Sequence, residues 1–224
     1  METHRYELKF NLNEVEYNEL KYFIAKQGFF KSYPNRIINS LYFESLKFDS
    51  VMENISGVSQ REKYRLRWYD NKTFTPIFEK KIRNGRIGRK VSFKIKNLSE
   101  KVIEKTSVIK LSELIFESLK NDYGYYMSDY FNPIIFINYQ REYYINRNGI
   151  RLTIDKNINF KQIRSNKTIS QSKKIKHHSY IMELKFDIEK KDILKQLIQN
   201  LNLRWERHSK YLTGLSRLGI VNYI

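Results

Sequence analysis

The stretch Arg61–Tyr69, REKYRLRWY, decides the fold because it alternates between two kinds of side chain. In an extended strand, successive side chains point to opposite faces of the sheet. One face then carries the cations Lys63, Arg65 and Arg67, and the other carries Tyr64, Leu66 and Trp68. On a one-sided sheet the cations would simply face water. The other strands must therefore show whether this cationic face is solvated or turned inward.

The same alternation recurs along the chain. The segments predicted as strands are YELKF, IINSLYF, REKYRLRWY, PIFEKKI, RKVSFKI, PIIFINYQREYYI, IRLTID and SYIMELKFD. Their charged faces set isolated carboxylates among Lys and Arg, whereas a solvated face would mix Ser, Thr, Gln and Lys. Glycine-containing loops at Asn84–Gly88 and Arg147–Gly149 predict hairpins.

Helical periodicity is confined to a few segments. Helices are predicted at Asn13–Gln27, Leu111–Leu119 and Glu189–Leu201, with a short one at His208–Leu218. The polar, basic segment Gln162–His178 predicts an exposed loop, in which His177 and His178 would be solvated. Because no repeat or Pro/Gly-rich linker interrupts the chain, residues 1–224 are predicted to form a single domain.

Composition narrows the class of partner. Lys and Arg total 42 against 24 Asp and Glu, a net charge of +18 in 224 residues, which favours a polyanionic partner. The chain has no cysteine, so disulfides and thiolate metal sites are excluded. No segment reads as a secretory signal or is apolar over the roughly 20 residues that cross a bilayer. We expect a cytoplasmic protein, with peripheral attachment to the inner face of a membrane as a variant of that location.

These patterns together predict an α+β fold: an eight-stranded antiparallel β-barrel with helices packed on its outside. The apolar strand faces would lie under the helices, and the cationic faces would line the interior. Burying so many cations without compensation is very costly. A phosphate chain clamped by the cations, with a divalent metal held by a carboxylate, removes that cost. The charge pattern therefore predicts an interior that binds phosphates.

Seven short motifs, in order, resemble the VTC domain, the polyphosphate polymerase branch of the CYTH-like triphosphate tunnel metalloenzymes. They are RYELKF, NSLYFES, KYRLRWY, FEKK, PIIFINYQREYY with RLTID, MELKF and HSKY, and they span nearly the whole chain. Arg5 stands where the triphosphatase and adenylate cyclase branch has the first Glu of Glu-x-Glu-x-Lys, which favours the polymerase branch. Fungal members also carry a regulatory domain and membrane helices, neither of which is expected here.

The resemblance implies roles for individual residues. The phosphate-binding catalytic residues would be Lys9, Arg65, Arg67, Lys81, Arg141, Arg151 and Lys210. Further substrate contacts would come from Arg5, Lys63, Lys185, Ser209 and Tyr139. Glu183 would be the principal ligand of Mn²⁺ or Mg²⁺, with Glu7 and Glu79 as weaker candidates. Any of these cations could instead lie on the surface. Lys90 and Lys94 could lie inside too, although their alternation with Val91 and Phe93 fits a solvated strand equally well. Glu183 could form an interior salt bridge. Asp155 is expected to pair with an arginine or to end its strand.

The activity implied is transfer of the γ-phosphate of ATP to a growing inorganic polyphosphate chain inside a basic, metal-containing tunnel. Hydrolysis of tripolyphosphate or of a nucleoside triphosphate by the same residues is the alternative. A basic protein that binds RNA is a third hypothesis. It would need aromatic side chains on the charged face, where only Tyr139 and Tyr143 are predicted. No nucleic acid is therefore expected as a partner, whereas ATP, polyphosphate and a membrane protein are.

Overall fold

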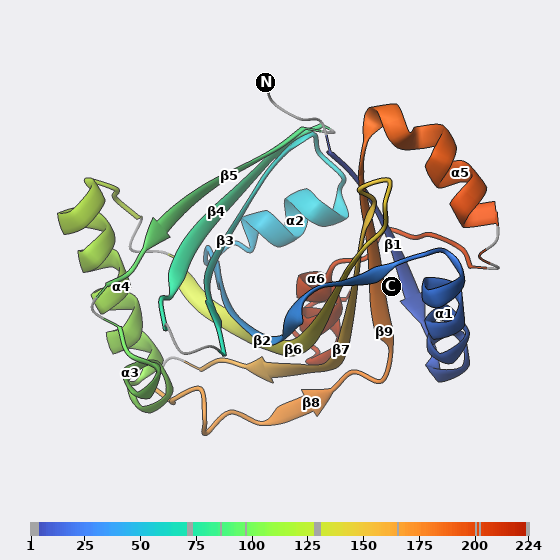
Figure 1. Ribbon diagram of the computed structural model, residues 1–224. Coiled ribbons are helices and arrows are strands. Elements are labelled where there is room, and N and C mark those ends of the chain that lie inside the picture. The colour runs from blue at the N-terminus through green and yellow to red at the C-terminus, as the bar shows by residue number, and fades with distance from the viewer. Residues whose placement is uncertain are drawn as a thin grey trace. The chain divides into compact units, whose positions relative to one another are not determined.

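The computed structural model describes residues 5–70, 74–85, 87–96, 98–127, 131–164, 166–199, 201 and 203–222, apart from the side chains of Arg5 and Ile87. Its strands are β1 (Arg5–Leu12), β2 (Phe30–Glu44), β3 (Gln60–Tyr69), β4 (Ile77–Asn84), β5 (Ile87–Lys94), β6 (Asn132–Ile145), β7 (Arg151–Gln162), β8 (Lys174–Lys176) and β9 (Tyr180–Asp187). They are labelled in Figure 1.

The strands form one sheet in the order β1-β9-β7-β6-β2-β3-β4-β5, and β8 pairs with β7. The register is antiparallel for β1 with β9, β9 with β7, and each neighbouring pair from β2 to β5. The prediction of an antiparallel α+β fold with helices is therefore confirmed. The hydrogen-bonded path of the described strands ends at β1 and β5, so it is an open path and not a closed ring.

The helices are α1 (Glu14–Lys26), α2 (Asp49–Ile55), α3 (Glu100–Lys105), α4 (Val108–Tyr123), α5 (Lys191–Gln199) and α6 (Lys210–Arg217), with a 3₁₀ turn at Ile188–Lys190. Asn13 caps α1 as predicted: its side chain accepts from the Glu16 amide, while the Glu16 carboxylate accepts from the Asn13 amide. In the described residues no helix is both long and apolar enough to cross a membrane.

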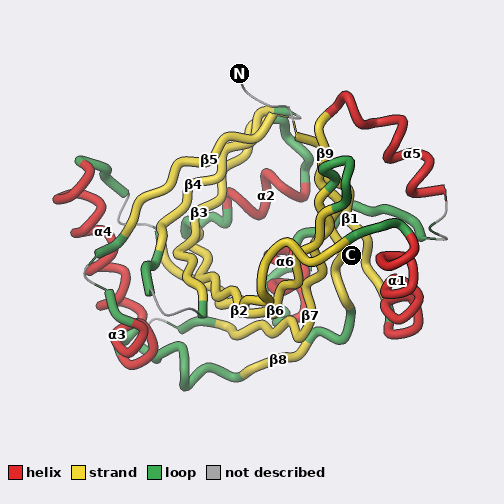
Figure 2. The backbone as a smooth tube through the Cα atoms, viewed as in Figure 1, coloured by secondary structure: helices red, strands yellow, loops and turns green. Residues whose placement is uncertain are grey.

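The chain divides into two compact units, each assembled from separate segments. Unit 1 comprises residues 1–37, 139–158 and 176–209, and unit 2 comprises residues 38–138, 159–175 and 210–224. In unit 1, α1 and α5 lie beside β1 and β9 (Figures 1 and 2). Its core joins Leu20 and Phe23 of α1 and Leu194 of α5 to Phe10 and Leu184 of the sheet.

The core of unit 2 contains the apolar face of the segment Arg61–Tyr69. Tyr64, Leu66 and Trp68 are buried against α3 and α4 in one hydrophobic cluster, which also contains Ile103 and Leu111. In both units the apolar strand faces therefore pack under helices, as the alternation predicts. The single domain over residues 1–224 stays a prediction.

Several local features differ from the sequence prediction. The described part of Gln162–His178 contains the short strand β8, and Ile163 and Ile169 are buried there. His177 was predicted to be solvated, which is wrong. It is only 6% exposed, its amide donates to the Ile158 carbonyl at 2.8 Å, and its ring stacks near that of His208. The short helices α2 and α3 were not predicted, because seven and six residues show too little periodicity.

Candidate functional site

In unit 1 a charged cluster lies on the face of β1, β9 and β7 opposite to the core. The register places Lys9 opposite Glu183, and Glu183 opposite Thr153. A second cross-strand row joins Glu7, Lys185 and Arg151. Directly opposite residues of an antiparallel pair have their side chains on the same face, close enough to interact. Three strands therefore bring residues from both ends of the sequence into one cluster.

Arg141 of β6 joins this cluster through a two-point ion pair with Asp155 of β7. Its Nε donates to Oδ1 at 2.5 Å and its Nη2 donates to Oδ2 at 2.6 Å. Nη2 also lies 3.5 Å from Glu183 Oε2, and the guanidinium lies over the ring of Tyr139 at 5.4 Å. Burial lowers the pKa of Arg141, but Asp155 and Glu183 outweigh it and raise that pKa, so the guanidinium stays charged. The expected pairing of Asp155 with an arginine is confirmed.

Glu7 and Glu183 share two ammonium groups. Lys9 Nζ lies 3.1 Å from Glu7 and 4.0 Å from Glu183, and Lys185 Nζ lies 3.9 Å and 3.3 Å from the same carboxylates. Lys9 Nζ also donates to the His208 carbonyl at 3.0 Å, which links the first predicted motif to the last. Charges of both signs therefore alternate across this part of the sheet.

The donor set fits a divalent cation held partly by substrate. Mg²⁺ is usually bound through one or two carboxylates together with phosphate oxygens. Glu7 and Glu183 supply two carboxylates, whereas both oxygens of Asp155 accept from Arg141. Across the described residues, no group of three or more His, Asp or Glu side chains is arranged to hold a metal ion alone. The residues therefore suit a cation that brings phosphates with it.

Unit 2 carries a second charged cluster, on the face of β3, β4 and β5 opposite to its core. Glu79, only 3% exposed, accepts from Arg65 Nε and lies 2.6 Å from Arg65 Nη2. Lys90 Nζ lies 2.8 Å from Glu79, and Arg67 Nη1 lies 4.0 Å from it. Burial raises the pKa of Glu79, but Arg65 and Arg67 outweigh it and lower the pKa to about 2. Glu79 is therefore an ion-pair partner in this structure, and its role as a metal ligand stays a prediction.

Rows of like charge distinguish the unit 2 cluster. The register places Lys81 opposite both Lys63 and Lys90, and Arg61 opposite Arg83. It also places Lys90 on the same face of the sheet as Lys63. Lys94 shares the face of Arg67, since both residues pair with Ile77. In the described residues of β3, β4 and β5, the only carboxylate on this face is Glu79. Like charges directly opposite each other are destabilising.

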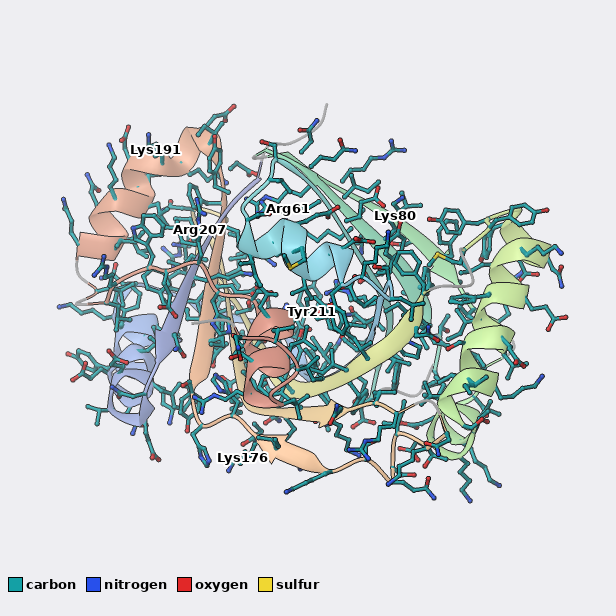
Figure 3. The ribbon with its side chains drawn as sticks, turned by 180° about the vertical axis from the view of Figure 1, so that it is seen from behind. Arg61, Lys80, Lys176, Lys191, Arg207 and Tyr211 are labelled. Carbon is teal, nitrogen blue, oxygen red and sulfur yellow. The ribbon has the colours of Figure 1, made fainter. Side chains whose placement is uncertain are left out.

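Buried tyrosines complete this second cluster. Arg65 donates to the Tyr42 hydroxyl at 3.2 Å, and Tyr42 stacks on Tyr211 of α6 with ring centroids 4.9 Å apart. Tyr211 projects from α6 (Figure 3) and its hydroxyl donates to the fully buried Glu44. Burial raises the pKa of Tyr42, but Arg65, Arg67 and Lys210 outweigh it and hold that pKa below its usual value. The HSKY motif therefore supplies a buried aromatic ring, that of Tyr211, as well as the cation Lys210.

The remaining predicted residues are placed as follows. Lys210 and Ser209 are half-buried at the start of α6, Tyr139 is buried in β6, and Arg151 is exposed at the start of β7. Lys63 lies over the ring of Tyr211 at 5.3 Å. The backbone of Arg5 pairs opposite Asp187, but its side chain lies outside the described residues. The roles assigned to all these residues stay predictions.

Sequence reasoning missed Ser40, Tyr42 and Glu44 as members of the unit 2 cluster. Ser40 accepts from Arg67 Nε at 3.2 Å, and Glu44 accepts from the amide and hydroxyl of Ser50. The signal was present, since NSLYFES alternates these three polar residues with Leu41 and Phe43. It was not used because none of the three is a cation.

Comparison with known proteins identifies the family. Residues 4–218 match the VTC domain, so the chain belongs to the VTC domain family. Among curated proteins the comparison finds no match.

Solved structures agree on the fold. A protein from Pyrococcus horikoshii OT3 aligns with a TM-score of 0.54 at 14% identity, over 97% of this chain and 99% of that one. A Hippeastrum protein described as an adenylyl cyclase with a dominant triphosphatase activity aligns with a TM-score of 0.55 at 14% identity. The alignment covers 97% of this chain and 98% of that one. A Vibrio parahaemolyticus protein assigned to the adenylate cyclases aligns with a TM-score of 0.53 at 12% identity. The alignment covers 95% of this chain and 97% of that one. At these identities the likeness concerns the fold alone.

Proposed function

We propose that this protein is a polyphosphate polymerase, which transfers the γ-phosphate of ATP to the end of a growing inorganic polyphosphate chain. Membership of the VTC domain family supports this activity more than any other. The structural observation that carries the proposal is the set of like-charged rows around one carboxylate in unit 2. Like charges directly opposite each other repel, and a bound anion would relieve that repulsion.

The arginines carry the phosphate-binding part of the proposal. Arg65, Arg67 and Arg141 are all largely buried, and each is oriented by a carboxylate, a hydroxyl or both. A guanidinium fixed in this way presents its remaining N–H groups in a planar fork that matches phosphate oxygens. The lysines Lys63, Lys81 and Lys90 add positive charge without a fixed geometry. The proposed division is that arginines position the phosphates while lysines neutralise the chain.

Catalysis would then be positioning and charge neutralisation. A terminal oxygen of the polyphosphate attacks the γ-phosphorus of ATP, the bond from that phosphorus to the β–γ bridging oxygen breaks, and ADP leaves. Preorganised cations stabilise the charge that develops on the transferred group and on the leaving oxygen. Glu7 and Glu183 would hold a divalent cation together with substrate phosphates, and such a cation would supply further neutralisation of phosphate charge. No protein nucleophile is required.

Hydrolysis is the second candidate, because the Hippeastrum neighbour is described as having a dominant triphosphatase activity. In that case water would attack in place of the polyphosphate end, with the same residues binding the phosphates. RNA binding has less support, since Tyr64 and Trp68 are buried in the unit 2 core and Tyr139 is 4% exposed. A membrane-protein partner and a peripheral location stay predictions.

The decisive experiment incubates the full chain with ATP and Mn²⁺ or Mg²⁺ and resolves the products by gel electrophoresis. We expect long polyphosphate, and its loss in Arg65→Ala and Arg141→Ala proteins that keep their circular dichroism spectra. Arg89→Ala, at an exposed position of β5, is the matched control and should retain activity. Free phosphate without polymer would favour the hydrolase. Full activity in both arginine variants would remove the site assignment.

A further inference from the structure

Thr153 of β7 is the buried group that the proposed mechanism leaves unexplained. Its side chain is 8% exposed, and its hydroxyl oxygen has no hydrogen-bond partner. In the part of the chain that the structure describes, no other buried hydroxyl oxygen lacks a partner. Ser50 and Ser112, for comparison, donate to Glu44 and to the Val108 carbonyl. Leaving a buried hydroxyl unpaired destabilises a protein, so its retention requires an explanation.

The surroundings of Thr153 indicate what the hydroxyl is for. It stands directly opposite Glu183, which in turn stands opposite Lys9, so the three side chains share one row and one face of the sheet. Its neighbours along β7 on this face are Arg151 and Asp155, and Asp155 orients Arg141. The side chain that carries the unpaired hydroxyl therefore lies on the same face of the sheet as the charged cluster of unit 1.

We propose that Thr153 is a substrate-binding residue whose hydroxyl donates a hydrogen bond to a phosphate oxygen of the bound triphosphate or polyphosphate. The inference rests on the proposed phosphate-binding function and adds a residue to it. Among Lys9, Arg141 and Lys185, a neutral donor fixes the position of one phosphate oxygen without adding charge. The bound phosphate supplies the partner that the hydroxyl lacks in the protein alone.

Three variants of the full chain separate this role from simple packing. Thr153→Val keeps the shape and removes the hydroxyl, Thr153→Ser keeps the hydroxyl and removes the methyl, and Thr106→Val makes the same chemical change at the end of α3. Affinity for tripolyphosphate is measured by calorimetry in EDTA, and the Tm of each protein is measured without ligand. These readouts do not depend on turnover or on a bound metal.

We expect Thr153→Val to bind tripolyphosphate about tenfold more weakly, as for the loss of one hydrogen bond to a charged group. Its Tm should be equal to or above that of the wild type, because an unpaired polar atom is removed. Thr153→Ser should stay within about threefold of the wild-type affinity, and Thr106→Val should be unchanged.

Two outcomes would overturn the inference. One is wild-type affinity in Thr153→Val, and the other is an equal loss in Thr153→Val and Thr153→Ser, which would show that keeping the hydroxyl does not preserve binding. If the wild-type protein itself binds no tripolyphosphate, the proposed function fails and this inference fails with it. If the wild type binds and makes polymer while Thr153→Val is unaffected, only the role of Thr153 is lost.

Discussion

Asp155 holds the guanidinium of Arg141 through two hydrogen bonds of 2.5 and 2.6 Å, and Asp155 is fully buried. Removing one member of a buried ion pair leaves an uncompensated charge, which typically costs about 3–5 kcal/mol. Asp155→Asn should therefore lower the free energy of unfolding by about that amount. It should also slow ATP turnover at least about tenfold, because Arg141 loses its fixed orientation. Urea unfolding and a steady-state assay would measure the two effects.

Asp192→Asn is the matched control for this change. Asp192 lies on α5, is strongly exposed, and pairs with Lys195 one helical turn away. Exposed pairs of this kind contribute under about 1 kcal/mol. If Asp155→Asn were no more damaging than Asp192→Asn, the ion pair would have neither a structural nor a positioning role.

Glu79 makes the stability of the protein depend on pH in a defined window. Its pKa is lowered from an ordinary 4.5 to about 2 in the folded state, because Arg65 and Arg67 outweigh the effect of burial. A carboxylate with a depressed folded-state pKa contributes its stability above the unfolded value and loses it as the pH falls through the folded value. The contribution should thus be complete above about pH 4.5 and disappear toward pH 2, with a size of about 3 kcal/mol.

Comparing the wild type with Glu79→Gln isolates this contribution. At pH 7 the variant should be less stable than the wild type, and the difference should shrink as the pH falls from about 4.5 to 2. Chemical unfolding at several pH values in that range measures the difference directly. A gap that stays constant with pH would mean that Glu79 is not an ionised partner of the arginines.

Glu183 is predicted to act differently from the cations around it. Glu183→Gln should reduce metal-dependent ATP turnover by about a hundredfold or more if its carboxylate holds the divalent cation. In EDTA the same variant should bind tripolyphosphate as tightly as the wild type or more tightly, because a negative charge has been removed. Glu62→Gln changes a carboxylate that pairs with Lys80, and serves as the control. Weaker binding by Glu183→Gln in EDTA would contradict a metal-ligand role.

The neighbours of Gly214 in α6 leave no space for a side chain at this position in unit 2. An added Cβ would lie 2.6 Å from Ile135 Cδ1 and 2.7 Å from Phe160 Cδ1. Helix propensity alone favours alanine over glycine by about 1 kcal/mol, whereas overpacking a core costs about 1–3 kcal/mol. Gly214→Ala should therefore lower the Tm, against the propensity. Adding Ile135→Val, which removes Cδ1, should recover part of the loss, and a thermal unfolding series would reveal the coupling.

The sequence predicts the strands well because their alternation is local. In β3 the odd-numbered residues Lys63, Arg65 and Arg67 lie on one face of the sheet. The even-numbered residues Tyr64, Leu66 and Trp68 lie on the other, as the alternation predicts. Alternation within one strand does not show which other strands it pairs with. The rows that join Lys9, Glu183 and Thr153, or Lys63, Lys81 and Lys90, depend on pairing register. For this reason Asp155 could be assigned a kind of partner from sequence, while the alternation alone did not show which charged side chains lie beside Thr153 and Tyr42.

The pairing of β1 with β9 also constrains how the protein is made. Residues 5–12 leave the ribosome well before their partner strand, residues 180–187. Until that late segment is synthesised, β1 exposes an unpaired edge and the apolar side chains of Phe10 and Leu12, and pairings so distant in sequence form slowly. A nascent chain arrested before residue 180 should therefore be protease-sensitive and bound by chaperones, and protection should begin only when β9 has emerged.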